Sequence, residues 1–171
     1  MRYCLSFVIA VLATLPLQAL PLSQSQVQVY FSPKGGCTDA VVNALNKAKK
    51  TILVQAYSFT SPPIAAALVE ANKRGVDIQV ILDKSQKTER YSGATFLKNH
   101  EVPVFIDASH KIAHNKVMVV DSDIVITGSF NFTKSAEEGN AENLLVISNA
   151  PDLAAEYIAN WKAHLKHSQP Y

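Results

Sequence analysis

Cysteine is scarce in this sequence: its 171 residues contain only Cys4 and Cys37. Cys4 lies in an N-terminal segment that we expect to be removed, so Cys37 would be the only thiol left. No disulfide could then form within the chain, even in an oxidising compartment. We interpret Cys37 as a small buried residue near a helix start rather than as a nucleophile, and a disulfide between two chains stays open.

An excess of charge of either sign is also missing. The chain has 16 Lys and Arg against 14 Asp and Glu, a formal net charge of +2. Without residues 1–19, which hold Arg2 and no acid, 15 basic and 14 acidic side chains remain. Total charge therefore gives no argument for a nucleic-acid partner, which would need a local basic cleft. Internal repeats and low-complexity segments are absent as well.

The apolar stretch from Leu5 to Leu15 is too short to span a bilayer comfortably. It follows Arg2 and leads through Pro16 to the small residue Ala19, the layout of a secretory signal peptide. We expect cleavage after Ala19, export to the periplasm or the medium, and no stable membrane association afterwards. A retained membrane anchor is the alternative.

The rest of the chain has the length of one domain with a real core. We assign residues 20–26 to a flexible lead-in and 27–171 to the domain. Strand-like and helix-like patterns alternate three times up to residue 107, which indicates a sheet with parallel members and helices on its faces. The expected strands are 27–31, 51–57, 76–82 and 102–107, and the expected helices are 38–50, 61–75 and 89–100. Thr38 is a plausible N-cap, Ser61 precedes a proline pair suited to a first turn, and Gly75 stands where a C-cap glycine belongs.

The pattern changes in the last third of the chain. The strand-like segments 116–121 and 124–129 are separated only by Ser122 and Asp123, a hairpin spacing that adds an antiparallel pair. The elements expected after them are a strand at 142–148 and a helix that begins at Pro151 and buries Leu153, Tyr157, Ile158, Trp161 and Leu165. We predict a single α/β domain with a mixed, mostly parallel β-sheet flanked by helices.

The segment "IAHNKVMVVDSDIVITGSFNF" (112–132) places charged and polar groups on strands that otherwise look buried. Alternation along a strand puts His114 and Lys116 on one face, whereas Asp121 falls on the other. Asp121 should therefore hold the hairpin or a neighbouring basic group rather than contact the histidine. Ser129 and Asn131 share a face at the end of the returning strand, so they can lie beside His114 and Lys116.

An imidazole, an ammonium, a hydroxyl and an amide at one sheet edge suit an anion whose charge builds on non-bridging oxygens. Attack on a phosphodiester is such a reaction. A neutral imidazole can attack phosphorus directly while Lys116 and Asn131 stabilise the five-coordinate species. This chemistry requires no metal and no cofactor.

Three other interpretations compete with this one. His110 and His114 are four residues apart, a zinc spacing on a helix, but the segment is loop and strand with no Cys or further His nearby in the sequence. A serine hydrolase is disfavoured because "GSFNF" lacks the Gly-x-Ser-x-Gly elbow. Taken singly, His114 would be a histidine capping a strand and Lys116 a solvated lysine.

Three ordered motifs resemble the phospholipase D superfamily. "HNKVMVVD" (114–121) matches its H-x-K-x4-D pattern, "GSFNF" (128–132) its Gly-Ser-x-Asn, and "NAE" (140–142) its later Asn-x-Glu. The order of expected strands and helices is also compatible. Length, leader and the single motif copy are similar to the small exported bacterial endonucleases of that family.

The resemblance implies a role for each matching residue. His114 would form a covalent phosphohistidine, Lys116 would bind the phosphate, and Ser129 and Asn131 would assist. Glu142 would orient the histidine ring, although without the resemblance it would be taken as an exposed acid at a strand start. The supporting positions implied by the motifs are Asp121, Gly128 and Asn140.

The family builds each active site from two motif copies, and this chain has one. We therefore expect a two-fold homodimer with one composite site, His114 of both chains facing one phosphate. The expected substrate is DNA, and RNA as well, cut with little sequence preference. The residues that could flank the site and bind backbone phosphates are Lys84, Lys87, Arg90, Lys111 and Lys134. A phospholipase or cardiolipin-type hydrolase and a non-catalytic nucleic-acid-binding module are the alternatives; polar loops such as "KSQKTERYSG" (84–93) favour the nuclease.

Overall fold

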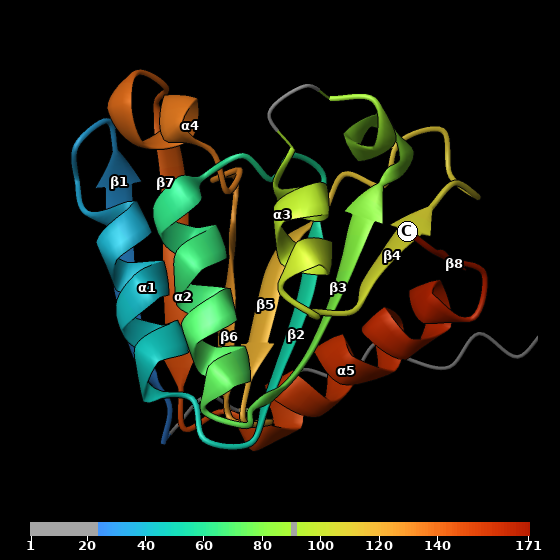
Figure 1. The fold of residues 1–171 in the computed structure, drawn as a ribbon. Coiled ribbons are helices and arrows are strands. Elements are labelled where there is room, and N and C mark those ends of the chain that lie inside the picture. Colours follow the sequence, from blue (N-terminus) through green and yellow to red (C-terminus); the bar gives the residue numbers. More distant parts are fainter. Residues whose placement is uncertain (1–23, 90–91) are drawn as a thin grey trace, which may run out of the picture.

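A computed structural model describes residues 24–89 and 92–171 (Figure 1). The signal peptide expected at 1–19, most of the lead-in, and Arg90 lie outside the described residues. Within the described ranges, no helix is both long and apolar enough to cross a membrane. The elements are β1 (Gln26–Ser32), α1 (Cys37–Lys47), β2 (Thr51–Ala56), α2 (Pro62–Lys73), β3 (Asp77–Asp83), the 3-10 helix η1 (Lys84–Lys87), α3 (Gly93–Asn99), β4 (Val104–Asp107), β5 (Lys116–Val120), β6 (Ile124–Gly128), α4 (Lys134–Glu138), β7 (Glu142–Ser148), α5 (Pro151–Leu165) and β8 (Gln169–Pro170).

The strands form one eight-stranded sheet in the order β1-β7-β6-β5-β2-β3-β4-β8. The prediction of a mixed sheet flanked by helices is confirmed. The expectation that most of it is parallel is wrong, since only the pairs β2–β3 and β3–β4 are parallel and the others are antiparallel. The strands after β4 explain the difference, because β5, β7 and β8 run opposite to β2, β3 and β4, and β1 pairs with β7 at the other end of the sheet.

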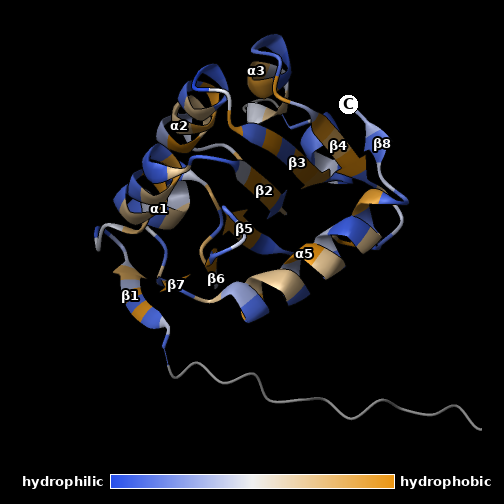
Figure 2. Ribbon diagram, turned by 90° about the horizontal axis from the view of Figure 1, so that it is seen from below, coloured by the Kyte–Doolittle hydropathy of each residue, from blue (hydrophilic) through white to orange (hydrophobic). Residues whose placement is uncertain are grey.

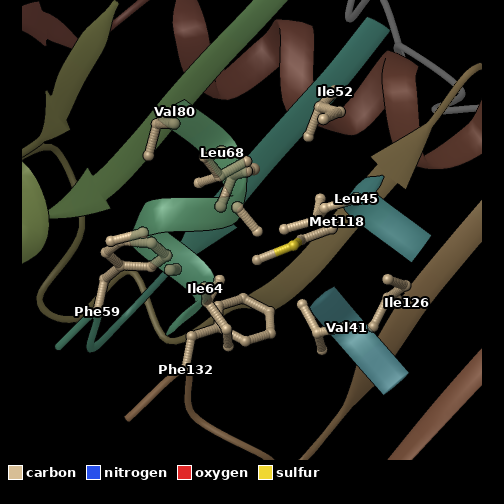
Figure 3. Close-up of a cluster of buried hydrophobic side chains, with 14 of the residues drawn as sticks. Val41, Leu45, Ile52, Phe59, Ile64, Leu68, Val80, Met118, Ile126 and Phe132 are labelled. Carbon is tan, nitrogen blue, oxygen red and sulfur yellow. The ribbon is translucent and has the colours of Figure 1, made fainter. Parts of the chain in front are cut away.

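Each face of the sheet is covered by its own helices. Helices α1, α2 and α3 lie on one face and α5 crosses the other, as Figures 1 and 2 show. Side chains alternate along β5, so Met118 faces the larger core under α1 and α2 while Val117 and Val119 pack under α5. Figure 3 shows part of the larger core, with the labelled residues Val41, Leu45, Ile52, Phe59, Ile64, Leu68, Val80, Met118, Ile126 and Phe132.

Most expected elements are present, with shifts at their ends. Gly75 follows α2 with φ 85°, the left-handed conformation that a glycine after a helix supplies. The helix expected at 89–100 is shorter, because α3 begins at Gly93. Trp161 is buried under the sheet, and its indole N–H donates a 2.8 Å hydrogen bond to the Val54 carbonyl. The other residues of the expected stripe on α5 are half-buried.

The prediction of Thr38 as the N-cap of α1 is wrong. The helix begins at Cys37, and its N-cap is Gly36 with φ 82° and no side-chain cap. The free backbone N–H groups of Gly36 and Thr38 instead donate to the Glu137 carboxylate at 3.2 and 2.7 Å. A residue a hundred positions away thus caps the helix, which local sequence signals cannot reveal.

Asp121 lies in the β5–β6 turn, at the end of β5 opposite His114. Its carboxylate accepts hydrogen bonds from the backbone N–H groups of Lys49, Lys50 and Thr51 at 2.9, 2.7 and 3.0 Å. Asp121 therefore holds the connection between α1 and β2 rather than the hairpin. Of the expected basic neighbours it has Lys50, which donates its backbone N–H and whose positive charge also lowers the pKa of Asp121. Burial alone would raise its pKa, but these three hydrogen bonds together lower the pKa below the ordinary aspartate value.

Replacing Asp121 by Asn should lower the free energy of unfolding at pH 7 by roughly 1–3 kcal/mol, because a neutral amide accepts the backbone N–H groups less strongly than a carboxylate. The folded pKa of Asp121 is depressed, so the carboxylate stabilises fully above about pH 4 and this contribution is lost as the pH falls through the folded pKa.

Urea unfolding of both proteins at pH 7 and at steps down to pH 2 measures this loss. The difference between wild type and variant should shrink with falling pH. Asp77→Asn, at the exposed start of β3, is the control and should change little. If the difference in unfolding free energy between the wild type and Asp121→Asn stayed constant down to the lowest pH, the assignment would be contradicted.

Candidate active site

The three motifs meet at one edge of the sheet. His114 ends the loop before β5, Gly128 ends β6, and Glu142 begins β7. Because β5, β6 and β7 are antiparallel neighbours, the start of β5, the end of β6 and the start of β7 lie together. The parallel strands β2, β3 and β4 end at the same edge, since β5 pairs antiparallel with β2 and Lys116 opposes Ala56.

His114 and Lys116 lie around the ring of Tyr57, which follows β2. The exposed His114 imidazole packs on this ring with 4.6 Å between centroids. Lys116 is only 7 % exposed, so it is not a solvated surface lysine. Its ammonium donates a 3.0 Å hydrogen bond to the His114 carbonyl and lies 5.1 Å from the Tyr57 ring centre, a cation–π distance. Sequence reasoning missed Tyr57, although its place after a buried strand was a signal.

Burial of the Lys116 ammonium has an electrostatic cost. It lowers the pKa of Lys116 below the ordinary lysine value, while the negative charge of Glu142 acts in the opposite direction. The attraction shows that the first and third motifs are electrostatically coupled. A desolvated ammonium beside an exposed imidazole is suited to bind an anion arriving from solvent.

The second motif alternates between core and site. Phe130 and Phe132 are fully buried, and Phe132 forms a parallel bridge with Phe59. Ser129 and Asn131 alternate with these two phenylalanines, so their side chains point to the opposite side, where the other motif residues lie. Gly128 has φ 145°, and a Cβ on it would lie 2.3 Å from the Asn143 carbonyl oxygen, so only glycine fits this close approach.

Glu142 is the centre of a hydrogen-bond network. The Ser129 hydroxyl donates to one of its oxygens at 2.6 Å, and the Asn140 amide donates to the other at 3.1 Å. Glu142 is thus not an ordinary exposed acid. Glu142 is expected to orient the His114 ring, but a hydrogen bond from that ring to the Glu142 carboxylate is not among the contacts of the described residues within one chain.

Asn131 leaves an acceptor unsatisfied. Its side-chain oxygen is buried and has no hydrogen-bond partner among the described residues. Such an atom costs about 1–3 kcal/mol, so native proteins rarely keep one without a use for it. Toward an anion at this edge only the side-chain N–H₂ of Asn131 can donate; its oxygen cannot.

Two buried aspartates shape the loop that carries His114. Asp83 and Asp107 end the adjacent strands β3 and β4 and are paired in register. The Asp83 carboxylate accepts the N–H of Ala113 at 2.7 Å and that of Ser85 at 2.9 Å, which fixes the backbone one residue before His114. Neither aspartate was singled out from the sequence, although an acid closing an apolar strand is a visible signal.

His110 lies in different surroundings from His114. Its ring contacts Asp107, His164 and His167, whereas the His114 ring contacts Tyr57. The sequence has no further histidine beside His110 and His114, but in space His164 on α5 and His167 just after it lie next to His110. The pair of His110 and His114 does not form a shared metal site within the described residues.

Cys37 is fully buried at the start of α1. Burial, reinforced by the negative charges of Glu137 and Glu142, raises the pKa of its thiol to about 11. A protonated, enclosed thiol is neither a nucleophile nor accessible to a second chain. The interpretation of Cys37 as a packing residue fits this environment.

Comparison with known proteins agrees with this fold. Residues 41–165 match the family model described as "Cardiolipin synthase, PLD-like domain". The phospholipase D of Rickettsia conorii is 41% identical over 140 residues, which cover 82% of this chain and 70% of that protein. The mitochondrial cardiolipin hydrolase of Xenopus tropicalis is 33% identical over 102 residues, 60% of this chain and 49% of that protein.

Solved structures give the same result. The phospholipase D family member Nuc from Salmonella typhimurium is 41% identical, with a TM-score of 0.84 over 86% of this chain and 99% of that one. NucT from Helicobacter pylori, 22% identical with a TM-score of 0.80, shares the fold. The fold and its polar edge therefore define a hydrolase of phosphodiester bonds. The chain belongs to the phospholipase D superfamily.

Proposed function

We propose that this protein is a metal-independent, largely sequence-nonspecific endonuclease that hydrolyses DNA, and RNA as well. The observation that carries the proposal is the 41% identity to Nuc along almost its whole length, together with the full set of motif residues at one open sheet edge. The exposed lysines on the loops around this edge, which suit backbone phosphates, are Lys84, Lys87, Lys111 and Lys134.

The proposed reaction has two displacements at phosphorus. A neutral ring nitrogen of one His114 attacks, the bond to the departing alkoxide breaks, and the His114 imidazolium of a second chain protonates that alkoxide. The second imidazole then takes a proton from water, which displaces the phosphate from the first histidine. Lys116, Ser129 and Asn131 stabilise the charge on the non-bridging oxygens. The two imidazoles start in different protonation states, so the rate should be bell-shaped in pH.

The main test is hydrolysis of plasmid DNA, RNA and phosphatidylcholine vesicles in EDTA at 25 °C. DNA cleavage is expected without added metal. His114→Ala should reduce the cleavage of DNA, and the hydrolysis of a simple bis-aryl phosphate, below detection, because the nucleophile is gone. Lys116→Ala should reduce the rate roughly 10²–10³-fold, as loss of an oxyanion donor does.

Lys47→Ala, at the exposed end of α1, is the matched control and should keep full activity. Turnover by His114→Ala would refute the nucleophile, and EDTA inhibition reversed by added metal at this temperature would refute metal independence. Cleavage of the vesicles alone would instead favour a lipid phosphodiesterase, the activity in the names of the Rickettsia and Xenopus relatives.

We also propose a two-fold homodimer that completes the active site. The support is an uncovered apolar row on the edge strand β1, where Val27, Val29 and Phe31 are 48, 50 and 65 % exposed. Val27 pairs with Ile147 of β7, and Ile147 pairs with Val125 of β6, which packs under α5. The row therefore lies on the same face of the sheet as α5, but α5 does not extend far enough to cover it. The row ends beside Ser32, which pairs with Glu142, and a partner bound there would reach the catalytic edge.

Replacing Val29 by Asp should separate the dimer, because a charge would be buried in the proposed interface. Sedimentation equilibrium should give the mass of one chain, and DNA cleavage should fall at least about tenfold, since each site then lacks its second imidazole. Gln28→Asp, on the opposite face of β1, should stay dimeric and active. A fully active single chain would contradict the composite site.

We propose export directed by residues 1–19, on the grounds of Arg2, the apolar run and Ala19. Mass spectrometry of the protein from the periplasm or medium of an expressing bacterium should find an N-terminus within a few residues of Leu20. Recovery of the intact chain from the membrane fraction would instead favour a retained anchor.

A further inference from the structure

A second cluster of chemically active side chains lies outside the proposed active site. It consists of Asp107 at the end of β4, His110 in the loop after it, His164 in the last turn of α5 and His167 just after this helix, and we name it the Asp–His cluster. Each pair is spaced i, i+3. In Figure 1, α5 crosses beneath the sheet and its last turn reaches the side of the sheet where β4 lies. One donor atom from each of the four residues falls within 4.8 Å of all the others.

The Asp107 carboxylate is the buried centre of the cluster. Its side chain is 0 % exposed, and its Oδ2 lies 2.7 Å from His164 Nδ1, 3.2 Å from His110 Nδ1 and 3.3 Å from His167 Nε2. The three ring centroids are 4.9, 5.2 and 5.3 Å apart, so the imidazoles surround the carboxylate. The other oxygen, Oδ1, accepts the backbone N–H of Ser109 at 3.0 Å and lies 3.3 Å from His110 Nδ1. Three imidazoles thus share one buried carboxylate, which brings three ring nitrogens and a carboxylate oxygen together.

We propose that Asp107, His110, His164 and His167 form a structural site for one transition-metal dication of the zinc class. Three imidazole nitrogens and one carboxylate oxygen are donors that Zn²⁺ accepts in tetrahedral geometry. Bonds of about 2.1 Å give a tetrahedron with edges of roughly 3.4 Å. The N–O distances of 2.7 to 3.3 Å are close to this value, and all four donor atoms lie within 4.8 Å of one another, so small shifts of the side chains would admit the ion. Magnesium and calcium, which prefer more oxygen ligands, do not fit this donor set.

The cluster is reachable from solvent. The side chains of His110 and His167 are 46 and 35 % exposed, while Asp107 anchors the site from below. An ion can thus enter without unfolding the chain. Four protein ligands fill a tetrahedral shell and leave no position for substrate, so the ion would stabilise structure rather than take part in hydrolysis.

The ion would join two parts of the chain that are far apart in sequence. Asp107 and His164 are 57 residues apart, and His110 lies on the loop that leads to His114. That loop is also held by Asp83 through Ala113 and by the Lys84 ammonium, which donates to the His110 carbonyl at 3.0 Å. Metal binding would fasten the end of α5 to the base of this loop.

The test measures metal binding directly, in the His114→Ala protein, so that its result does not depend on catalysis or on zinc binding at the active site. The protein is treated with EDTA, dialysed and titrated with ZnCl₂ in a calorimeter. One zinc per chain is expected. Zinc at about a hundred times the dissociation constant should raise Tm by roughly 5–10 °C, and EDTA should reverse the shift. MgCl₂ should leave Tm unchanged.

His167→Gln and His110→Gln alter partly exposed ligands and should each weaken zinc binding at least about tenfold, because three donors hold the ion less well than four. His100→Gln is the matched control, since His100 lies at the end of α3 and bonds the Phe96 carbonyl instead. Absence of a zinc-dependent shift, or equal zinc affinity in His167→Gln and the parent, would overturn the proposal.

Discussion

The antiparallel pairing of β5 with β2 is the constraint on which the site depends. β2, β3 and β4 run in parallel and end at one edge, so a strand beside them must run backwards for its first residue to lie there. β5 does so, and the loop before it delivers His114 and Lys116 to that edge. The hairpin to β6 and the return through β7 then bring the other two motifs to the same place.

Lys116 is held at this edge at an electrostatic cost. Its ammonium is buried against the Tyr57 ring and the His114 carbonyl. A rigid apolar support makes this tenable, because Phe130 and Phe132 fix the backbone from below. The site is preorganised for an anion rather than formed around one.

Carboxylates organise the remaining connections. Asp83 holds the residue before His114, Glu137 caps α1, and Asp121 holds the entry to β2, each by accepting backbone N–H groups. Asp107 differs, since three imidazoles surround it. Of these four acids, only Asp121 was singled out from the sequence, without its backbone partners. Apart from the local contacts to Ser85, Ser109 and His110, the partners of these acids lie 30 to 101 residues away, beyond the reach of local patterns.

The sequence by itself determined the described strands except β8, most helices, the single mixed-sheet domain and the three motifs, because hydrophobic periodicity and motif spacing are local properties. Only the tertiary structure decided how many strand pairs are antiparallel, that Tyr57 lies between His114 and Lys116, and that α5 brings His164 and His167 to Asp107. These contacts join residues far apart in the chain. They are set by the burial of apolar side chains on both faces of the sheet, which depends on the whole chain, so no single stretch of sequence reveals them.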